Sequence, residues 1–381
     1  MKIVVAPDKF KGSLPATEVA AAIAAGLRAE LPAAELVTIP VADGGDGTVD
    51  AAVAAGFERV PVTVDGPTGE PVRASYARRG EVAVVELAGV CGLVRLPGGR
   101  PAPLTASSFG AGQTLAAALA AGARRIIFGV GGSASTDGGA GLLQALGARV
   151  LDTRGEPLAR GGAALRDVAA LDLAGLHPAL RSSTVILATD VANPLTGPDG
   201  AAEVYGPQKG ASPDQVRELA SGLRRWASVV AKATGTTGRD WSQAPGAGAA
   251  GGVGFAALAV LRAEPRPGIE LVLDLVDFGA ALDGAALVIT GEGSLDTQTL
   301  AGKAPAGVAQ AAARRGIPVV AVAGRSTLTA AQLAAAGISA VYTLSDLEPD
   351  PARSSAGASL LLRRVGQALA RDRLAQAVTG P

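Results

Sequence analysis

Four turns in this chain carry acidic residues directly after short apolar runs. They contain Asp8, Asp43 with Asp46, Asp190, and Glu292 with Asp296. Carboxylates can bind Mg²⁺ and can accept the proton of a hydroxyl group. Helix capping or turn formation would explain any single one of these turns. Capping does not require a lysine nearby, however, and Lys9, Lys11 and Lys303 lie in the first and last turns. The pattern therefore favours phosphoryl transfer. This reaction needs carboxylates that bind the metal and accept the proton, and cations that neutralise the charge of the phosphate.

The stretch 126–150 predicts a strand, a glycine-rich turn and a helix. Glycine lets backbone N–H groups approach a phosphate, and a helix N-terminus adds partial positive charge. Asp137 is the one charged residue of the turn, so a phosphate bound there would need a cation, which suggests a nucleotide with a metal. The alternative is a tight structural turn with Asp137 as the helix N-cap. The stretch by itself does not separate the two interpretations.

Cysteine and histidine are nearly absent, which excludes several kinds of chemistry. The chain of 381 residues has one cysteine, Cys91, and one histidine, His177. A disulfide framework and a Cys/His zinc site are excluded within one chain. A Ser–His–Asp hydrolase would depend on His177, in a Gly/Pro-rich loop, and Cys91 in its apolar run is predicted to be a buried small residue.

Charge and hydropathy exclude further classes of partner. The chain has 34 basic and 34 acidic residues, so its net charge of zero predicts no nucleic-acid or membrane partner. No stretch is both long and apolar enough to suggest a membrane span. We therefore expect a cytoplasmic protein, and a homodimer stays open.

The six lysines are distributed unlike the 28 arginines. Lys9, Lys11, Lys209 and Lys303 lie in turns rich in glycine, proline or acid, whereas Lys2 and Lys232 resemble ordinary surface residues. Since the chain otherwise favours arginine, a lysine kept in such turns suggests a compact phosphate-binding ammonium group.

The elements around these turns alternate between strand and helix at both ends of the chain. Two strand–turn–helix units in the first 55 residues, and three further strands after residue 286, predict an α/β fold with a doubly wound parallel sheet. The segment from residue 57 onward instead begins like an antiparallel meander. We predict one doubly wound domain from 1–60 plus 268–381 and an inserted mixed α+β domain from 61–267. In such sheets ligands bind beyond the carboxyl ends of the strands, and we expect the site in the cleft between the domains.

Two common nucleotide signatures are missing. Gly302 and Lys303 are followed by Ala304 and lack the upstream glycine spacing of a Walker A motif. The segment GVGGSA (129–134) matches only a loose form of the dinucleotide motif, with Asp152 near the position of a ribose-binding acid. A dinucleotide-dependent oxidoreductase acting on a hydroxy acid is therefore retained as a weaker alternative.

Seven motifs together resemble the bacterial glycerate kinases, in particular those of the glycerate 2-kinase type. They are PDKFKGSL (7–14), ADGGDGT (42–48), GGSASTDGGAG (131–141), DVANPL (190–195), GPQKGA (206–211), PGAGAAGG (245–252) and TGEGSLDTQTLAGK (290–303). The similarity spans nearly the whole chain in the same order. This sequence departs from the pattern at Lys9, where Ser is frequent, at Asp46, where Glu is frequent, and at Thr136, where Asn is common.

The resemblance implies ATP- and Mg²⁺-dependent phosphorylation of D-glycerate to 2-phosphoglycerate. It also implies a flavodoxin-like doubly wound domain with a second domain inserted. Two other outcomes stay open, namely a kinase that forms 3-phosphoglycerate and a non-catalytic protein that binds nucleotide or carboxylate.

Roles for individual residues follow from this reaction. We expect Asp8, Lys11 and Ser13 to bind the acceptor. We expect the ATP phosphates at Gly131, Gly132, Ser133, Asp137, Gly138 and Gly139. The catalytic candidates are Asp43, Asp190, Asp296 and Lys303, and the metal-ligand candidates are Asp43, Asp190 and Glu292. Asp43 and Asp190 fit either the metal or the general base, and Lys303 would neutralise the transferred phosphoryl group.

Overall fold

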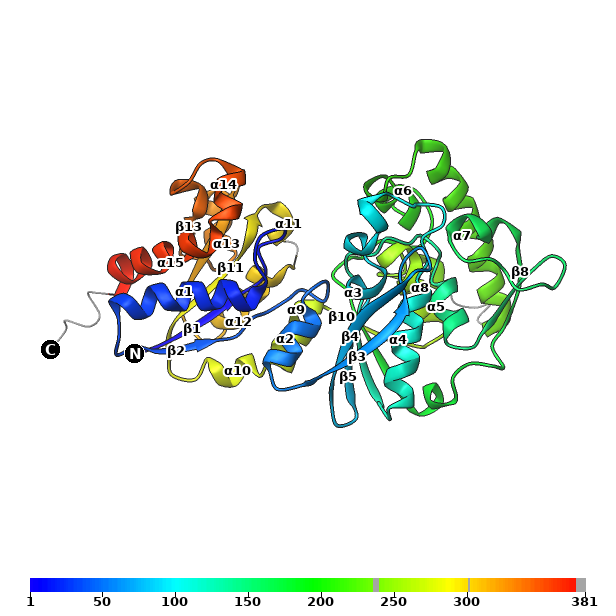
Figure 1. Cartoon of the computed structure of the whole chain (residues 1–381), viewed down its shortest axis with the longest axis horizontal. Coiled ribbons are helices and arrows are strands. Elements are labelled where there is room, and N and C mark those ends of the chain that lie inside the picture. Colours follow the sequence, from blue (N-terminus) through cyan, green and yellow to red (C-terminus); the bar gives the residue numbers. More distant parts are fainter. Residues whose placement is uncertain (236–239, 301, 375–381) are drawn as a thin grey trace. The chain divides into compact units, whose positions relative to one another are not determined.

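The computed structural model divides into two compact units (Figure 1). The structure describes residues 1–235, 240–300 and 302–374. Unit 1 comprises Met1–Asp43, Asp50–Gly56 and Ile269–Pro381, and unit 2 comprises Gly44–Val49 and Phe57–Gly268. None of the helices within the described residues has the length and apolar character needed to cross a membrane.

Unit 1 is built on a five-stranded parallel sheet that draws on both ends of the chain. Its order is β2 (Glu35–Thr38), β1 (Lys2–Pro7), β11 (Ala285–Leu295), β12 (Val319–Ser326) and β13 (Ala340–Thr343). The buried strands are rich in valine, isoleucine and alanine, as a sheet covered on both faces requires. The chain moves outward from β1 in one direction and from β11 in the other, so the order reverses between them. The predicted doubly wound α/β domain formed by both chain ends is confirmed.

Helices cover both faces of this sheet. Ile3 and Val5 of β1 face a core shared with α1 (Ala16–Glu30) and α15 (Ala358–Leu369). Val4 and Ala6 face the opposite core, shared with α9 (Gly268–Leu275) and α12 (Ala304–Ala313). Helices α1 and α15 run side by side (Figure 1). Their contact depends on Gly26, where a Cβ would lie 2.1 Å from the carbonyl oxygen of Arg363. The shorter helices of the unit are α2 (Thr48–Ala54, shared with unit 2), α10 (Phe278–Ala281), α11 (Thr297–Leu300), α13 (Ala330–Ala335) and α14 (Pro351–Ala356).

Unit 2 contains a six-stranded mixed sheet. Its order is β10 (Glu264–Arg266), β9 (Thr184–Ala188), β6 (Arg125–Gly129), β5 (Val82–Glu86), β4 (Pro71–Arg79) and β3 (Glu58–Asp65). The predicted meander corresponds to β3, β4 and β5, which pair antiparallel, whereas β5, β6, β9 and β10 pair parallel. The helices are α3 (Ala88–Cys91), α4 (Phe109–Ala120), α5 (Ala140–Ala145), α6 (Ala201–Tyr205), α7 (Pro213–Thr234) and α8 (Ala249–Ala259). Cys91 is fully buried in this core, as predicted.

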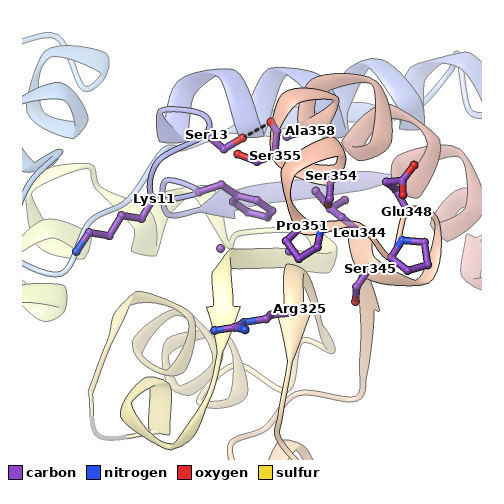
Figure 2. A pocket seen from close by; sticks show the side chains of 14 residues that line it. Lys11, Ser13, Arg325, Leu344, Ser345, Glu348, Pro351, Ser354, Ser355 and Ala358 are labelled. Carbon is purple, nitrogen blue, oxygen red and sulfur yellow. Dashed lines mark hydrogen bonds between the residues drawn. The ribbon is translucent and has the colours of Figure 1, made fainter.

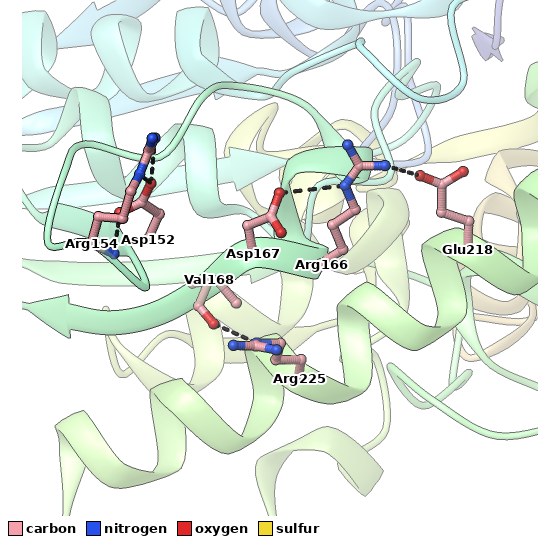
Figure 3. A network of polar contacts seen from close by, with 7 residues as sticks. All are labelled: Asp152, Arg154, Arg166, Asp167, Val168, Glu218 and Arg225. Atoms are coloured by element: carbon pink, nitrogen blue, oxygen red, sulfur yellow. Dashed lines mark hydrogen bonds and ion pairs between the residues drawn. The ribbon is translucent and has the colours of Figure 1, made fainter.

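A separate hairpin of β7 (Arg149–Asp152) and β8 (Val168–Asp172) lies against α7. Figure 3 shows the polar contacts around it, in which Arg166 pairs with Asp167 and with Glu218 of α7. Asp152 pairs with Arg154 inside its own turn. Since β7 pairs with β8 alone, Asp152 does not end a strand of the parallel sheet beside β6. The dinucleotide alternative therefore loses its ribose-binding acid.

Candidate active site

Acidic side chains meet at the carboxyl ends of β1 and β11 in unit 1. The backbone N–H of Asp8 donates to the carbonyl oxygen of Gly291 at 2.8 Å, which continues the pairing of the two strands beyond Pro7. By the alternation along a strand, Asp8 and Glu292 point to the face that carries α9 and α12. After β2 the chain stays beside β1, because the N–H of Val41 donates to Pro7 at 3.0 Å, and this leads Asp43 to the same edge. We call Asp8, Asp43 and Glu292 the acidic group.

The environments of Asp8 and Glu292 favour the protonated forms of these two carboxyls. Burial raises the pKa of Asp8 to about 7, and the charges of Asp43 and Glu292 add to this, although Lys9 at 3.7 Å opposes it. Burial also raises the pKa of Glu292, against a 2.5 Å hydrogen bond from the Thr299 hydroxyl and the charge of Lys303. The Lys303 Nζ lies 4.0 Å from Glu292 Oε2. Buried, neighbouring carboxyls with raised pKa values are typical of a functional site.

The residues of the acidic group fit a magnesium ion that arrives with phosphate. No cluster of three or more His, Cys, Asp or Glu side chains is preformed for a metal within the described parts of the chain. Magnesium is usually held by one or two carboxylates plus substrate phosphates and water, so a preformed cage is not required. A divalent cation would also relieve the repulsion through which Asp43 raises the pKa of Asp8 and of Glu292.

Asp296, a predicted catalytic residue, organises the turn beside Glu292. Its Oδ1 accepts from the backbone N–H of Gln298 at 2.8 Å, and its own N–H donates to the Thr299 hydroxyl at 3.1 Å. Thr299 in turn donates to Glu292 Oε1. The backbone N–H of Asp296 therefore helps to orient Glu292 through Thr299, while the Asp296 carboxylate accepts within its own turn.

In unit 2 the predicted phosphate turn has an exposed start and a buried remainder. Gly131 and Gly132 are exposed, whereas residues 133–139 are buried. The carboxylate of Asp137 accepts from the N–H and the hydroxyl of Ser108 at 2.8 and 2.9 Å, from Ser107 at 3.2 Å and from Gly139 N–H at 3.1 Å. The N-cap of α5 is Gly139, at φ 73°, so the N-cap interpretation of Asp137 is wrong. Asp137 instead holds the turn against the start of α4.

Lys209 supports the same turn from the other side. It is 3 % exposed, and its Nζ donates to the carbonyl oxygen of Ser135 at 2.5 Å. Burial lowers the pKa of Lys209 to about 8, and the charge of Asp137 opposes that shift. The motif containing Lys209 was visible in the sequence, but its partner was not, because Ser135 lies 74 residues away.

A second glycine-rich segment locks the turn in place. Gly138 N–H donates to the carbonyl oxygen of Gly251 at 3.0 Å. Gly251 has φ +66°, and a Cβ there would lie 2.1 Å from the carbonyl oxygen of Ser135 and 2.9 Å from Lys209 Nζ. The segments 135–138 and 250–252 therefore touch backbone to backbone.

The pairing of β6 with β9 brings two predicted site residues to one edge. Gly129 and Ala188 are register partners, so Gly131 and Asp190 both follow at the carboxyl ends of neighbouring strands. Asp190 is exposed, and its Oδ1 accepts from the backbone N–H of Gly268 at 2.8 Å. The loop 44–49 packs on this edge, because a Cβ on Gly131 would lie 2.7 Å from the Cα of Gly45.

Glu86 anchors that loop and was not a predicted site residue. It is 6 % exposed at the end of β5, and its Oε2 accepts from the N–H groups of Gly47 and Val49 at 3.0 and 3.1 Å. The one available signal was an acid inside the apolar run EVAVVELAGV. Glu86 holds the start of α2 and thereby the DGGDG segment.

Glu86→Ala is expected to lower the free energy of unfolding by about 2–3 kcal/mol, because two N–H groups lose their acceptor. Glu86→Gln is the matched control, since its amide oxygen can still accept. Urea unfolding of both variants measures the difference. Equal stability of the two would contradict an anchoring role.

The predicted acceptor residues Lys11 and Ser13 line a cavity of about 260 Å³ in unit 1 (Figure 2). Lys11 is exposed. The Ser13 hydroxyl donates to the carbonyl oxygen of Ser355 at 2.8 Å, so it ties the loop after β1 to α14. Neither residue contacts the acidic group through a hydrogen bond or ion pair in the part of the chain that the structure describes.

Comparison with known proteins places these features in a family context. Residues 3–374 match the model of the glycerate kinase family. The chain is 46% identical over 347 residues to a glycerate kinase of Bacillus subtilis and 44% identical over 348 residues to a glycerate 2-kinase of Escherichia coli, covering 90% of both chains in each case. A solved structure from Salmonella typhimurium LT2, provisionally named glycerate kinase 2, superposes with a TM-score of 0.83 at 42% identity and 99% coverage of both chains.

Proposed function

Because this chain belongs to the glycerate kinase family, we propose that it transfers the γ-phosphoryl group of ATP to the 2-hydroxyl of D-glycerate. The products are ADP and 2-phosphoglycerate. The observation that carries the proposal is the acidic group with Lys303 at the carboxyl ends of β1 and β11. The choice of the 2-hydroxyl follows the name of the Escherichia coli relative, a glycerate 2-kinase.

Asp43 and Glu292 are the residues of unit 1 that would hold Mg²⁺. Asp190 stays a predicted metal ligand. A Mg²⁺ ion held there would supply positive charge that offsets the negative charge of the phosphates. Lys303 lies 4.0 Å from Glu292, where an ammonium group can stabilise negative charge on the transferred phosphoryl group. The backbone N–H of Asp296 helps to keep Glu292 oriented through Thr299.

The general base takes the proton of the acceptor hydroxyl. Asp43 and Asp190 were predicted for this role, and Asp8 joins them because its pKa of about 7 lies near the pH at which a base works best. Asp8 is 5 % exposed, so the carboxylate oxygen that would accept the proton is shielded from bulk water.

In unit 2, the exposed Gly131 and Gly132 would offer backbone N–H groups to ATP phosphates. Ser133, Asp137, Gly138 and Gly139 would keep that turn in shape. In unit 1, Lys11 and Ser13 would bind the acceptor together with Asp8. The division into domains at 60 and 268, a cytoplasmic location and a homodimer stay predictions.

An assay of ADP release with ATP, Mg²⁺ and D-glycerate tests the proposed reaction. Rapid ADP release that depends on D-glycerate is expected, and NMR of the product should show the phosphate on the 2-oxygen. A signal from 3-phosphoglycerate would correct the position of transfer. Binding of ATP or glycerate without ADP release would leave a non-catalytic binding protein.

Asp190→Asn should lower kcat at least about a hundredfold if Asp190 is the base. The isosteric amide can still accept the hydrogen bond from Gly268 N–H, so the fold should be kept. Saturating initial rates, with circular dichroism to check folding, measure the effect. Near-normal turnover would remove Asp190 from the role and leave Asp8 and Asp43.

A further inference from the structure

Arg325 lies at the end of β12, on the face of the unit 1 sheet to which Asp8 and Glu292 point. Ala321 and Ala323 of β12 belong to the core on the side of α9 and α12. Alternation along the strand puts Arg325 on that side too. Ala323 is the register partner of Glu292 on β11. Arg325 therefore lies two residues, or about 7 Å, further along the same edge.

A hydrogen bond from the neighbouring strand fixes the direction of this side chain. Arg325 Nε donates to the Ser294 hydroxyl at 3.2 Å, and the two residues are register partners. Ser294 follows Glu292 by two residues, so it shares the same face. Figure 2 shows Arg325 at the border of the cavity, apart from Ser13 and Ser355. A guanidinium carries five N–H donors, so the bond to Ser294 leaves both terminal amino groups of Arg325 for a ligand.

Two lysines at this edge are already paired with its carboxyls. Lys9 Nζ lies 3.7 Å from Asp8, and Lys303 Nζ lies 4.0 Å from Glu292. Arg325 is exposed and has no ion-pair partner within the part of the chain that the structure describes. A cation that is held in place beside carboxyls but pairs with none of them is available to an anionic ligand.

The proposed acceptor is itself an anion. The carboxylate of D-glycerate is charged at neutral pH, so the negative charge of the acidic group repels it. A cation on the same edge offsets this repulsion. Arginine suits the task, because its planar guanidinium meets both carboxylate oxygens with two parallel N–H groups.

We propose that Arg325 binds the carboxylate of the acceptor and thereby makes the enzyme select a hydroxy acid over an uncharged alcohol. The inference rests on the proposed kinase function and names a residue that sets its substrate class. The 2-hydroxyl is on the carbon next to the bound carboxylate, so the same contact places the reacting oxygen. Ser294 is a positioning residue, because it acts through the guanidinium.

The first test is steady-state kinetics of ADP release. Arg325→Ala should raise KM for D-glycerate about 10- to 100-fold, because charge-assisted hydrogen bonds are lost. Since the carboxylate is held alike before and during transfer, kcat should stay within about threefold and KM for ATP within about twofold. Arg325→Lys keeps the charge without the planar fork and should give an intermediate KM. Arg364→Ala removes an exposed arginine from α15 and is the matched control, with both KM values unchanged.

The second test compares D-glycerate with D-glyceramide, which has the same shape and no charge. The wild type should prefer the acid by at least about a hundredfold in kcat/KM, because the amide leaves the guanidinium without an anionic partner. In Arg325→Ala this preference should fall at least about tenfold, since only the acid loses an ion pair. A variant that disturbs the site in general would lower both rates alike and keep the preference.

The third test examines the bond from Arg325 to Ser294. Ser294→Ala should raise KM for D-glycerate about two- to tenfold, because the guanidinium loses the acceptor that orients it. In the Arg325→Ala background the same change should add less than about twofold, since both substitutions act on one contact. Equal effects in the two backgrounds would contradict the positioning role of Ser294.

Three kinetic results would overturn the assignment of Arg325. They are an unchanged KM for D-glycerate in Arg325→Ala, a KM that rises for ATP and not for the acid, and a loss of kcat alone with an unchanged preference over D-glyceramide. If the wild type releases no ADP, the proposed kinase function fails, and calorimetric titration with D-glycerate then decides the role of Arg325. Binding weakened at least about tenfold in Arg325→Ala supports it. Equal binding to both proteins, or no binding to the wild type, refutes it.

Discussion

Asp8→Asn is expected to lower kcat by two to three orders of magnitude, within the range that general bases contribute. The variant keeps the shape of the side chain, and its amide oxygen can still accept from the Lys9 N–H, as Asp8 does at 2.6 Å. It removes the negative charge and the ability to accept a proton. Initial rates at saturating ATP and D-glycerate measure the loss. A kcat within threefold of wild type would show that the reaction does not need the Asp8 carboxylate.

The same substitution is expected to stabilise the metal-free protein above pH 7. The pKa of Asp8 is about 7 in the folded state against 3.8 as the reference value, so the folded state binds more protons between these values. The free energy of unfolding therefore falls as pH rises from about 4 to 7, by at most about 4 kcal/mol, and the loss is complete above pH 7. Asn carries no charge and escapes this loss.

Urea unfolding at pH 5 and pH 8 with EDTA tests this stability prediction. The wild type should lose more stability between the two pH values than Asp8→Asn. Asp346→Asn, at an exposed acid of the same unit, controls for general charge effects and should follow the wild type. Parallel pH dependence of wild type and Asp8→Asn would show that burial of Asp8 costs nothing.

Gly251→Ala is expected to lower the free energy of unfolding by about 3–5 kcal/mol. The new Cβ would lie 2.1 Å from the carbonyl oxygen of Ser135, so the backbones of the two glycine-rich segments must separate. The N–H of Gly138 and the Nζ of Lys209 would then lose their close partners. Because these contacts hold the proposed phosphate turn, KM for ATP should rise at least tenfold in the folded fraction.

Gly235→Ala is the matched control for Gly251→Ala. Gly235 has φ +67°, against +66° for Gly251, but among the described residues a Cβ there would meet no atom within 4 Å. It should cost only the roughly 1–2 kcal/mol of a left-handed L-residue. Thermal unfolding followed by circular dichroism measures both variants. Similar losses would mean that backbone conformation, and not the close approach to Ser135, accounts for the effect.

Local pattern was sufficient to predict the architecture of unit 1. Apolar strands such as residues 3–6 and 287–290, each followed by a turn and a helix, imply parallel strands because only a crossover can reconnect them. Parallel strands bring their carboxyl ends to one edge, so Asp8 and Glu292 could be expected together before any contact was known. The pairing of Ile3 with Leu287 lies beyond such reasoning, since no local pattern encodes a partner that far along the chain.

Side-chain partners in unit 2 could not be predicted in this way. In sequence, Asp137 fits a phosphate turn and a structural turn equally well. Its orientation depends on how α4 packs against α5, which brings Ser107 and Ser108 to its carboxylate. Lys209 and Glu86 likewise act through backbone groups 74 and 37–39 residues away. Burial decides which of these polar residues face a ligand, and burial is a property of the packed molecule.

The position of β1 between β2 and β11 in its sheet has a consequence for synthesis on the ribosome. β1 can pair with β2 early, but its other neighbour, β11, starts at Ala285. At about 5–20 residues per second, the nascent β1 waits on the order of tens of seconds with one edge unpaired, while unit 2 emerges and can fold. An exposed strand edge invites pairing with other chains. We therefore expect newly made protein to need protection by a chaperone at its amino-terminal strand until the last third of the chain has been translated.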